Sequence, residues 1–184
     1  CDVEYSSAHA GGLSWAHVRL VPLVAPDGSV TGVVTATRDL TELKAAQSVL
    51  AHQAHHDPST GVANRHSMVE RIGLALADLE RHPGRVALLF IDQDNFKVIN
   101  DRWGHDGGDH LLVELAGRLA RAARKTDIVA RFGGDEFVMV LGHLLDDVAG
   151  LYSLATRVQG ALSRPVAYRG DQLRVTASIG VVVT

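Results

Sequence analysis

Residues 128–141 read IVARFGGDEFVMVL, which is two short apolar runs on either side of a polar turn. Residues 128–132 and 137–141 have the length and the β-branched and aromatic content of strands. Two of the four residues between them are glycines, which tolerate the backbone angles of a tight turn. The stretch therefore predicts an antiparallel hairpin that carries Asp135 and Glu136 at its tip.

Helices and strands alternate around this hairpin. Residues 86–91 form a continuous apolar run of strand length, which indicates a buried central strand. Apolar residues at helical spacing predict one helix before that strand, one between it and the hairpin, and one after the hairpin: Met68, Ile72, Leu76 and Leu79; Leu111, Leu112, Leu115 and Leu119; Leu151, Leu154, Val158 and Leu162. Residues 173–183 are the last predicted strand. After the leading helix the order is β-α-β-β-α-β, so the sequence predicts a ferredoxin-like α+β domain.

The first third of the chain has a different pattern. A turn at residues 26–29 (Pro-Asp-Gly-Ser) separates two strand-like runs, and this predicts a β-hairpin. Two or three strands cannot enclose a core alone, so we interpret residues 1–38 as the end of a domain that begins earlier. Residues 39–56 predict an amphipathic linker helix, which either is a simple connector or pairs with a second copy. A cluster of turn residues then opens the second domain, residues 57–184.

Composition excludes several classes of protein. The chain has 184 residues, of which 46% are apolar and 21% charged, and its net charge of -3 does not indicate a nucleic-acid-binding surface. A single cysteine, Cys1, excludes an internal disulfide and a cysteine zinc site. No apolar run approaches the roughly 18 residues of a membrane span. We therefore expect a cytoplasmic segment without nucleic-acid or membrane contacts.

Acidic residues follow the central strand and lie at the tip of the hairpin. Asp92 and Asp94 come directly after residues 86–91, and in a β-α-β-β-α-β sheet this strand is a neighbour of the hairpin. These two residues could therefore converge with Asp135 and Glu136. Converging carboxylates bind hard cations such as Mg²⁺, and two such cations can clamp both oxygens of a phosphoryl transfer. From the residues alone, solvated turn acids are the alternative.

Five ordered motifs resemble the GGDEF domains of diguanylate cyclases, which condense two GTP molecules into cyclic di-GMP. The signature is residues 131–137, Arg-Phe-Gly-Gly-Asp-Glu-Phe. The other four motifs are residues 57–65, 90–101, 104–109 and 178–181. Together they cover residues 57–184 and imply the nucleotidyl cyclase form of the α+β fold. Ser59 and Val62 stand where the family has leucine, and the family's final helix would lie beyond Thr184, so we expect the C-terminal part of the domain to be missing.

The resemblance implies a metal centre at the acidic residues. Asp92 and Asp135 would hold Mg²⁺ or Mn²⁺ through their carboxylates, and the main-chain carbonyl of Gln93 would be a further ligand. Asp135 would also help to deprotonate the attacking 3′-hydroxyl, while Glu136 supports the metal cluster. Asp135 and Glu136 are thus the implied catalytic residues.

The resemblance also implies substrate-binding residues after the central strand. Asn100 and Asp109 would read the guanine edge of GTP, which suits an amide that donates and accepts and a carboxylate that accepts from N–H groups. Lys97 and the backbone of Phe96 would contact the phosphates. From the residues alone, Asn100 could equally be a turn residue and Asp109 a helix cap.

Residues 124–127 precede the signature and resemble an R-x-x-D product-inhibition site. Arg124 would bind a phosphate or a guanine edge with two hydrogen bonds, and Asp127 would accept from guanine N–H groups. The alternative is a basic helix C-terminus, where positive side chains favour the helix dipole. Given the resemblance, we expect feedback inhibition by cyclic di-GMP.

The implied mechanism needs two subunits, because one domain holds one GTP and a monomer cannot close the ring. We therefore expect a homodimer in which the linker helix controls dimerisation. The alternative function is a non-catalytic GTP-binding module that regulates an adjacent phosphodiesterase domain. Residues 1–38 resemble the C-terminal strands of a PAS sensor domain, and residues 38–42 match its usual exit into a signalling helix.

Overall fold

The computed structural model describes residues 1–9, 12–144 and 148–184. They divide into two compact units, residues 1–52 and residues 53–184, which we describe separately. None of the helices in the described part of the chain combines the length and the apolar character that crossing a membrane requires.

The first unit is a three-stranded antiparallel sheet that leads into a helix. The sheet order is β1 (Asp2–His9), β2 (Gly12–Val24) and β3 (Val30–Asp39), and α1 (Thr41–His55) follows. The predicted turn between β2 and β3 is present, and the carboxylate of Asp27 accepts from the backbone N–H and the hydroxyl of Ser29 at 3.0 and 2.6 Å. The predicted hairpin and linker helix are therefore both confirmed.

Few side chains of the first unit are buried. Leu40, between β3 and α1, is 8% exposed, and Lys44 of α1 lies over the ring of Trp15 and pairs with Glu4 at 3.0 Å. None of the residues of α1, all of which the structure describes, is buried. Leu43, Val49 and Leu50 are among its exposed apolar side chains.

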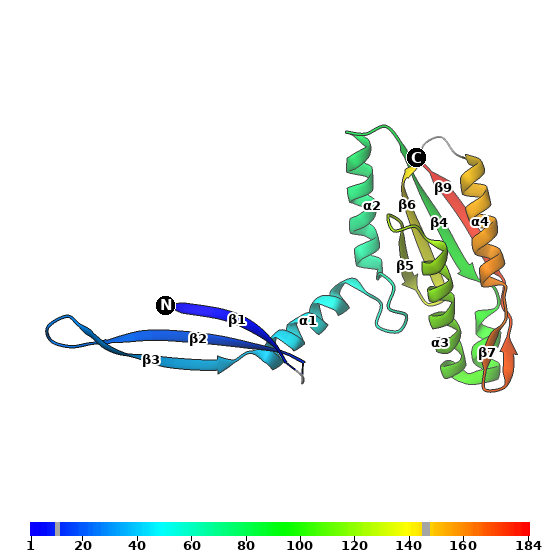
Figure 1. Cartoon of the computed structure of the whole chain (residues 1–184). Helices are drawn as coiled ribbons and strands as arrows, with labels where there is room; N and C mark the ends of the chain where they lie inside the picture. Colours follow the sequence, from blue (N-terminus) through cyan, green and yellow to red (C-terminus); the bar gives the residue numbers. More distant parts are fainter. Residues whose placement is uncertain (10–11, 145–147) are drawn as a thin grey trace. The chain divides into compact units, whose positions relative to one another are not determined.

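The second unit is a four-stranded antiparallel sheet with helices on both faces (Figure 1). The sheet order is β5-β6-β4-β9, and the chain order is α2 (Arg65–Leu79), β4 (Arg85–Gln93), α3 (Phe96–Ala122), β5 (Ile128–Gly133), β6 (Glu136–Leu144), α4 (Val148–Leu162) and β9 (Ala177–Val183). This order confirms the predicted β-α-β-β-α-β arrangement and α+β class. Asn64 begins α2, because its side-chain oxygen accepts from the N–H of Ser67 at 3.0 Å.

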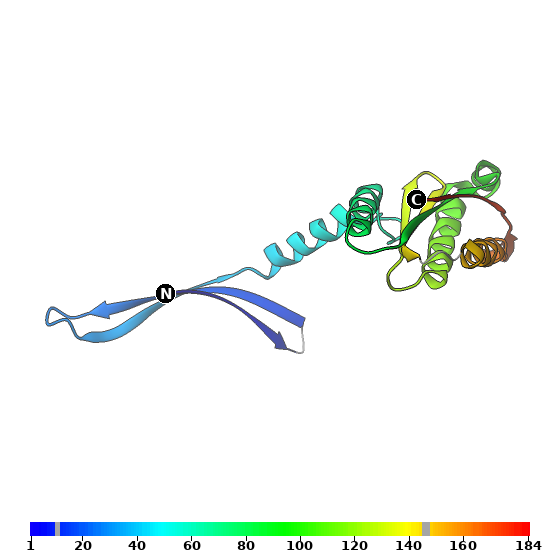
Figure 2. The same cartoon turned by 90° about the horizontal axis from the view of Figure 1, so that it is seen from above.

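Two apolar clusters form because successive residues of a strand point to opposite faces of the sheet. Ala87, Leu89 and Ile91 of β4 are fully buried in the larger cluster, with side chains of α3 and α4. Val86 of β4 and Val138 of β6 lie in the smaller cluster, beneath α2. Figure 2 shows the resulting layers, with α2 on one side of the sheet and α3 and α4 on the other.

Two predictions for this unit are corrected: the last strand and the length of the second helix. The single strand predicted at residues 173–183 is wrong: β8 (Asp171–Leu173) pairs with β7 (Val166–Tyr168) in a separate hairpin, and β9 begins only at Ala177. A tight turn in which Arg169 and Gly170 both have positive φ, 48° and 90°, joins β7 to β8, and residues 174–176 separate β8 from β9. The second helix is also longer than its leucine pattern indicates, since α3 begins at Phe96 and includes a break at Gly104.

Candidate active site

The ends of β4 and β6 bring three predicted acidic residues together. Asp92 is the direct register partner of Glu136, and Asp135 precedes Glu136 in the turn of the hairpin. Directly paired residues of antiparallel strands have Cα atoms about 4.5–5.5 Å apart, and their side chains share one face. Asp92 is exposed, and Asp135 and Glu136 are half-buried. The predicted proximity of Asp92 to the acids of the glycine turn is therefore confirmed.

Asp94, the fourth acid, is held by two hydroxyl groups at the start of β9. Its carboxylate accepts from the hydroxyl of Thr176 at 2.5 Å and from that of Ser178 at 2.8 Å, and its N–H donates to the carbonyl of Thr176 at 2.9 Å. These hydrogen bonds, that from Thr176 above all, lower the pKa of Asp94 below the ordinary aspartate value. Asp94 thus fastens the end of β4 to the start of β9 through two hydroxyl groups, whereas Asp92 pairs directly with Glu136.

Gln93 contributes its side chain to the core and not to the acidic cluster. It continues the buried face of Leu89 and Ile91 and is 2% exposed. Neither atom of its amide has a hydrogen-bond partner among the described residues. A metal-ligand role for Gln93 therefore falls to its main-chain carbonyl, as predicted, because the side chain points to the opposite face from Asp92.

The acidic cluster fits a hard divalent cation only in part. In the described residues, no group of three or more His, Cys, Asp or Glu side chains is arranged so that it could hold a metal ion. Asp92, Asp135 and Glu136 supply the carboxylate oxygens that Mg²⁺ prefers, and this ion usually completes its shell with water and substrate phosphates. The donor set is thus suited to a cation that arrives with a nucleotide.

Arg131 holds the turn of the hairpin from within the same strand pair. Its Nε and Nη2 donate to the carbonyl of Gly134 at 2.9 and 2.7 Å, and its Nη1 lies 3.1 Å from a carboxylate oxygen of Asp57. Asp57 also accepts from the N–H and hydroxyl of Thr60 at 2.9 and 2.7 Å. Burial acts to raise the pKa of Asp57, but these hydrogen bonds and the guanidinium charge outweigh it and lower that pKa. The turn before α2 is thereby tied to the Gly134 carbonyl, next to Asp135.

The predicted substrate residues gather around Gly108 on α3. A Cβ atom at Gly108 would lie 2.0 Å from the Asn100 side-chain oxygen and 3.0 Å from the Phe96 ring, so both side chains pack directly on this buried glycine. Asp109 is the next residue along the chain, and it is exposed. Lys97 is exposed on the first turn of α3. The structure therefore brings Phe96 and Asn100 together at Gly108, and Asp109 follows this glycine directly in the chain.

Comparison with known proteins identifies the family of the second unit. A family model described as "Diguanylate cyclase, GGDEF domain" matches residues 54–184. The chain belongs to the GGDEF family of diguanylate cyclases. The chain spans between 16% and 31% of the length of the first curated relatives that it matches.

Three relatives illustrate the similarity of this GGDEF domain. The diguanylate cyclase TpbB of Pseudomonas aeruginosa is 40% identical over 135 residues, which are 73% of this chain and 31% of that protein. The structure of a sensory box/GGDEF family protein from Caulobacter crescentus CB15 superposes with a TM-score of 0.67 at 40% identity, covering 70% of this chain and 83% of that one. The coiled coil and GGDEF domain of Caulobacter crescentus DgcB, solved with c-di-GMP, superposes with a TM-score of 0.70 at 25% identity, covering 78% and 76%.

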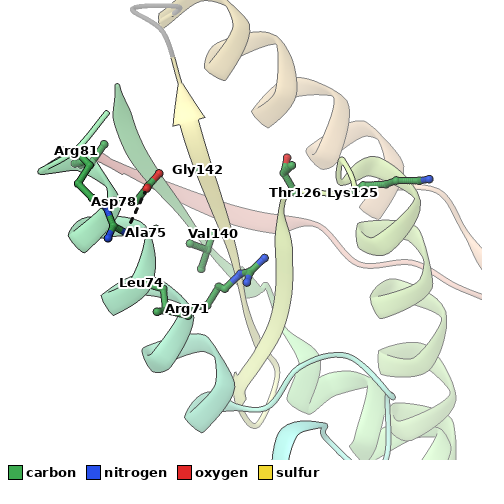
Figure 3. A pocket seen from close by; sticks show the side chains of 10 residues that line it. Arg71, Leu74, Ala75, Asp78, Arg81, Lys125, Thr126, Val140 and Gly142 are labelled. Carbon is green, nitrogen blue, oxygen red and sulfur yellow. Dashed lines mark ion pairs between the residues drawn. The ribbon is translucent and has the colours of Figure 1, made fainter. Parts of the chain in front are cut away.

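The predicted product-inhibition residues of the GGDEF domain lie at the other end of β5 from the acidic turn. The carboxylate of Asp127 accepts from the backbone N–H of Arg124 at 2.7 Å, and the Arg124 side chain is exposed. A cavity of about 400 Å³ opens next to this turn, between α2 and the sheet. Figure 3 shows Arg71 extending from α2 toward β5, Arg81 paired with Asp78 at 3.7 Å, and Lys125 pointing away from α2.

Residues that hold the GGDEF site in place were missed from the sequence, although the residues expected to bind metal and substrate were named. Arg131 and Asp57 both lie in motifs that were recognised, but they are 74 positions apart, and no periodic pattern links them. The contacts of Trp103 and of the β7–β8 hairpin were also missed, because two three-residue strands leave no detectable alternation in the sequence.

Proposed function

We propose that this GGDEF domain makes cyclic di-GMP from two GTP molecules. Each subunit binds one GTP, and two subunits face each other. Each 3′-hydroxyl then attacks the partner nucleotide's α-phosphate, which releases pyrophosphate. The observation that carries the proposal is the direct pairing of Asp92 with Glu136 beside the Asp135 turn.

The acidic residues have separate roles in this reaction. Asp92 and Asp135, with the Gln93 carbonyl, hold Mg²⁺ or Mn²⁺, and Glu136 supports them from the paired position. When bound, the cation neutralises charge on the triphosphate and on the leaving pyrophosphate. A carboxylate oxygen of Asp135 accepts the proton of the 3′-hydroxyl, and the Arg131 hydrogen bonds to Gly134 keep that carboxylate in place.

The residues on α3 select the base. The Asn100 amide and the Asp109 carboxylate read the guanine edge, and the packing of Asn100 on Gly108, directly before Asp109, supports a shared pocket. Lys97 and the Phe96 backbone contact the phosphates at the start of α3, where unpaired N–H groups favour anions.

Dimerisation and product inhibition regulate the reaction. The exposed apolar side chains of α1 support contact with a second copy, because a homodimer brings two nucleotide sites face to face. Arg124 and Asp127 bind cyclic di-GMP as an inhibitor. A further guanidinium supports this, since Arg157 donates to the carbonyl of Ala122, two residues before Arg124.

Residues 1–38 are the last strands of a PAS-like sensor domain. Two of its strands pair so that Val3 lies opposite Val18 and Tyr5 opposite Ala16, which places four apolar side chains on one face. A one-sided apolar face is typical of a sheet that contributes to a domain core. We therefore assign signal input to this unit.

The proposal is tested by incubating the purified chain with GTP and Mg²⁺ and measuring cyclic di-GMP by liquid chromatography and mass spectrometry. We expect product from the wild type, none from a folded Asp135→Ala variant, and wild-type turnover from Glu80→Gln, a change in an exposed carboxylate at the end of α2. Undiminished turnover in Asp135→Ala would reject the assigned site. Tight GTP binding by the wild type without product would favour the regulatory module instead.

A further inference from the structure

We propose that the β7–β8 hairpin is a clamp that fixes the two guanine-reading residues relative to each other, with Trp103 and Asp171 as its positioning residues. The inference rests on the proposed function, because it assigns guanine reading to Asn100 and Asp109. It adds a specificity role for a hairpin that lies outside the recognised motifs.

The clamp is needed because α3 is not one continuous helix. Gly104 has φ 71° and ψ 175°, which is not a helical conformation. Asn100 lies before this break and Asp109 lies after it. A regular helix would set the relative orientation of two such residues through its hydrogen-bond ladder, but a break in the ladder removes that constraint. Side-chain packing across the break, such as that of Asn100 on Gly108, and contacts from outside α3 set it instead.

The β7–β8 hairpin contacts α3 on both sides of the break. Before the break, Nε1 of Trp103 donates to the carboxylate of Asp171 at 3.0 Å. After it, Nε2 of His110 donates to the carbonyl of Ala167 at 3.0 Å, and Arg169 lies 3.6 Å from the carboxylate of Asp106. One short hairpin thus spans the break with three polar contacts.

Close packing reinforces these polar contacts. A Cβ atom at Gly107 would lie 2.6 Å from Cβ of Trp103 and 3.4 Å from the ring of Tyr168. The Trp103 side chain and the Tyr168 ring therefore meet at this buried glycine, directly before Gly108. The hairpin itself is anchored, since Val166 is 3% exposed and Leu173 is fully buried in the main core. An anchored element can hold both parts of α3 at a constant separation.

The clamp affects base recognition and not the metal chemistry. Asn100 and Asp109 act on one guanine together only while their separation is fixed, whereas Asp92 and Glu136 are held independently by the register of β4 and β6. Loosening the hairpin should therefore raise KM for GTP and weaken discrimination against ITP, which lacks the 2-amino group that a carboxylate can bind. It should leave kcat nearly unchanged.

The test uses Asp171→Ala, Trp103→Phe and their combination. We expect KM for GTP to rise about fivefold, the effect of one hydrogen bond worth about 1 kcal/mol, in each single variant. The double variant should lose no more than either single variant, because both remove the same contact. Asp171→Asn keeps an acceptor oxygen and should restore much of the loss. Gln172→Ala, at the neighbouring exposed position of β8, is the matched control.

A second measurement separates the clamp from the proposed function. Amide hydrogen exchange of residues 100–110 should become severalfold faster in Asp171→Ala and Trp103→Phe, but not in Gln172→Ala, whether or not the chain turns over GTP. A wild type that makes no cyclic di-GMP would count against the proposed function alone. Unchanged exchange together with an unchanged GTP-to-ITP preference would overturn the clamp even in an active enzyme.

Discussion

The acidic end of the sheet and the broken helix α3 position site residues by different means. Asp92 and Glu136 are adjacent because Ile91 and Phe137, the next pair in the register, are fully buried in the core. A slip of one residue would turn that buried pair to the wrong face, so packing specifies the register strongly. On α3, the break at Gly104 leaves the relative position of Asn100 and Asp109 dependent on side-chain packing across the break and on contacts from the β7–β8 hairpin. The sheet therefore positions Asp92 and Glu136 through the hydrogen bonds between its own strands, whereas α3 relies on packing around its break to position Asn100 and Asp109.

The largest effect is expected from Asp92→Asn, which tests the acidic residues at the end of the sheet. The amide keeps the size of the side chain but loses the negative charge that holds the cation. We expect kcat to fall by about 100-fold or more, since each tenfold loss corresponds to about 1.4 kcal/mol of transition-state stabilisation. Turnover should be measured at several Mg²⁺ concentrations, and wild-type rates at all of them would contradict the assignment.

Arg131→Ala tests whether the hairpin turn depends on support from the turn at Asp57. The change removes both hydrogen bonds to Gly134 and leaves the mostly buried Asp57 carboxylate without its cation. We expect kcat to fall by about tenfold and the free energy of unfolding by roughly 2–3 kcal/mol. Arg131→Lys, which keeps the charge but not the paired donors, should recover stability more than rate. Equal recovery of both would indicate a purely structural role.

Gly108→Ala tests whether the position of Asn100 on α3 matters for GTP binding. The added methyl group would overlap the Asn100 oxygen, so the Asn100 side chain must move away from residue 108. We expect KM for GTP to rise by about tenfold, or about 1.4 kcal/mol, with a smaller change in kcat. Gly73→Ala on α2 is the control, because nothing lies within 4 Å of that position and alanine favours helix by about 1 kcal/mol. If KM stays at the wild-type value, Asn100 does not contribute to GTP binding.

The smallest expected effect concerns acid stability. The pKa of Asp57 is lower in the folded chain than in the unfolded chain. At pH values between these two pKa values, the unfolded chain therefore binds more protons than the folded chain. The stability from Asp57 is therefore fully present above the ordinary aspartate pKa of about 3.9 and is lost as the pH falls through the folded value. Urea unfolding between pH 3 and pH 6 should show a shallower pH dependence in Asp57→Asn than in the wild type. Parallel curves would exclude this contribution.

Much of the catalytic domain could be predicted from sequence because its signals are local. The apolar run at residues 86–91 and the glycine turn at residues 133–136 each specify a strand or a turn without outside help, and their order then places Asp92 near Asp135. Motif resemblance added Asn100 and Asp109, whose positions no periodicity would single out.

The remaining features depend on contacts between distant residues. Asp94 looks equivalent to Asp92 in the sequence, and the hydroxyls of Thr176, directly before β9, and of Ser178 on β9 distinguish them. Gln93 sits at a core position that alternation would assign to an apolar residue. The strand predicted at residues 173–183 joined the last residue of β8 to β9 and left β7 out, because three-residue strands and a positive φ at Arg169, a non-glycine residue, have no clear sequence signal.

The difference between Asp92 and Asp94 also provides the most direct test of the metal site. Mn²⁺ binding should be measured by electron paramagnetic resonance with a non-hydrolysable GTP analogue in the wild type and in Asp92→Asn, Asp135→Asn and Asp94→Asn. We predict that Asp92→Asn and Asp135→Asn lose the bound Mn²⁺ signal and that Asp94→Asn, whose carboxylate is engaged by β9, retains it. Retention of Mn²⁺ in the first two variants, or equal loss in all three, would contradict a shared cation at the paired ends of β4 and β6.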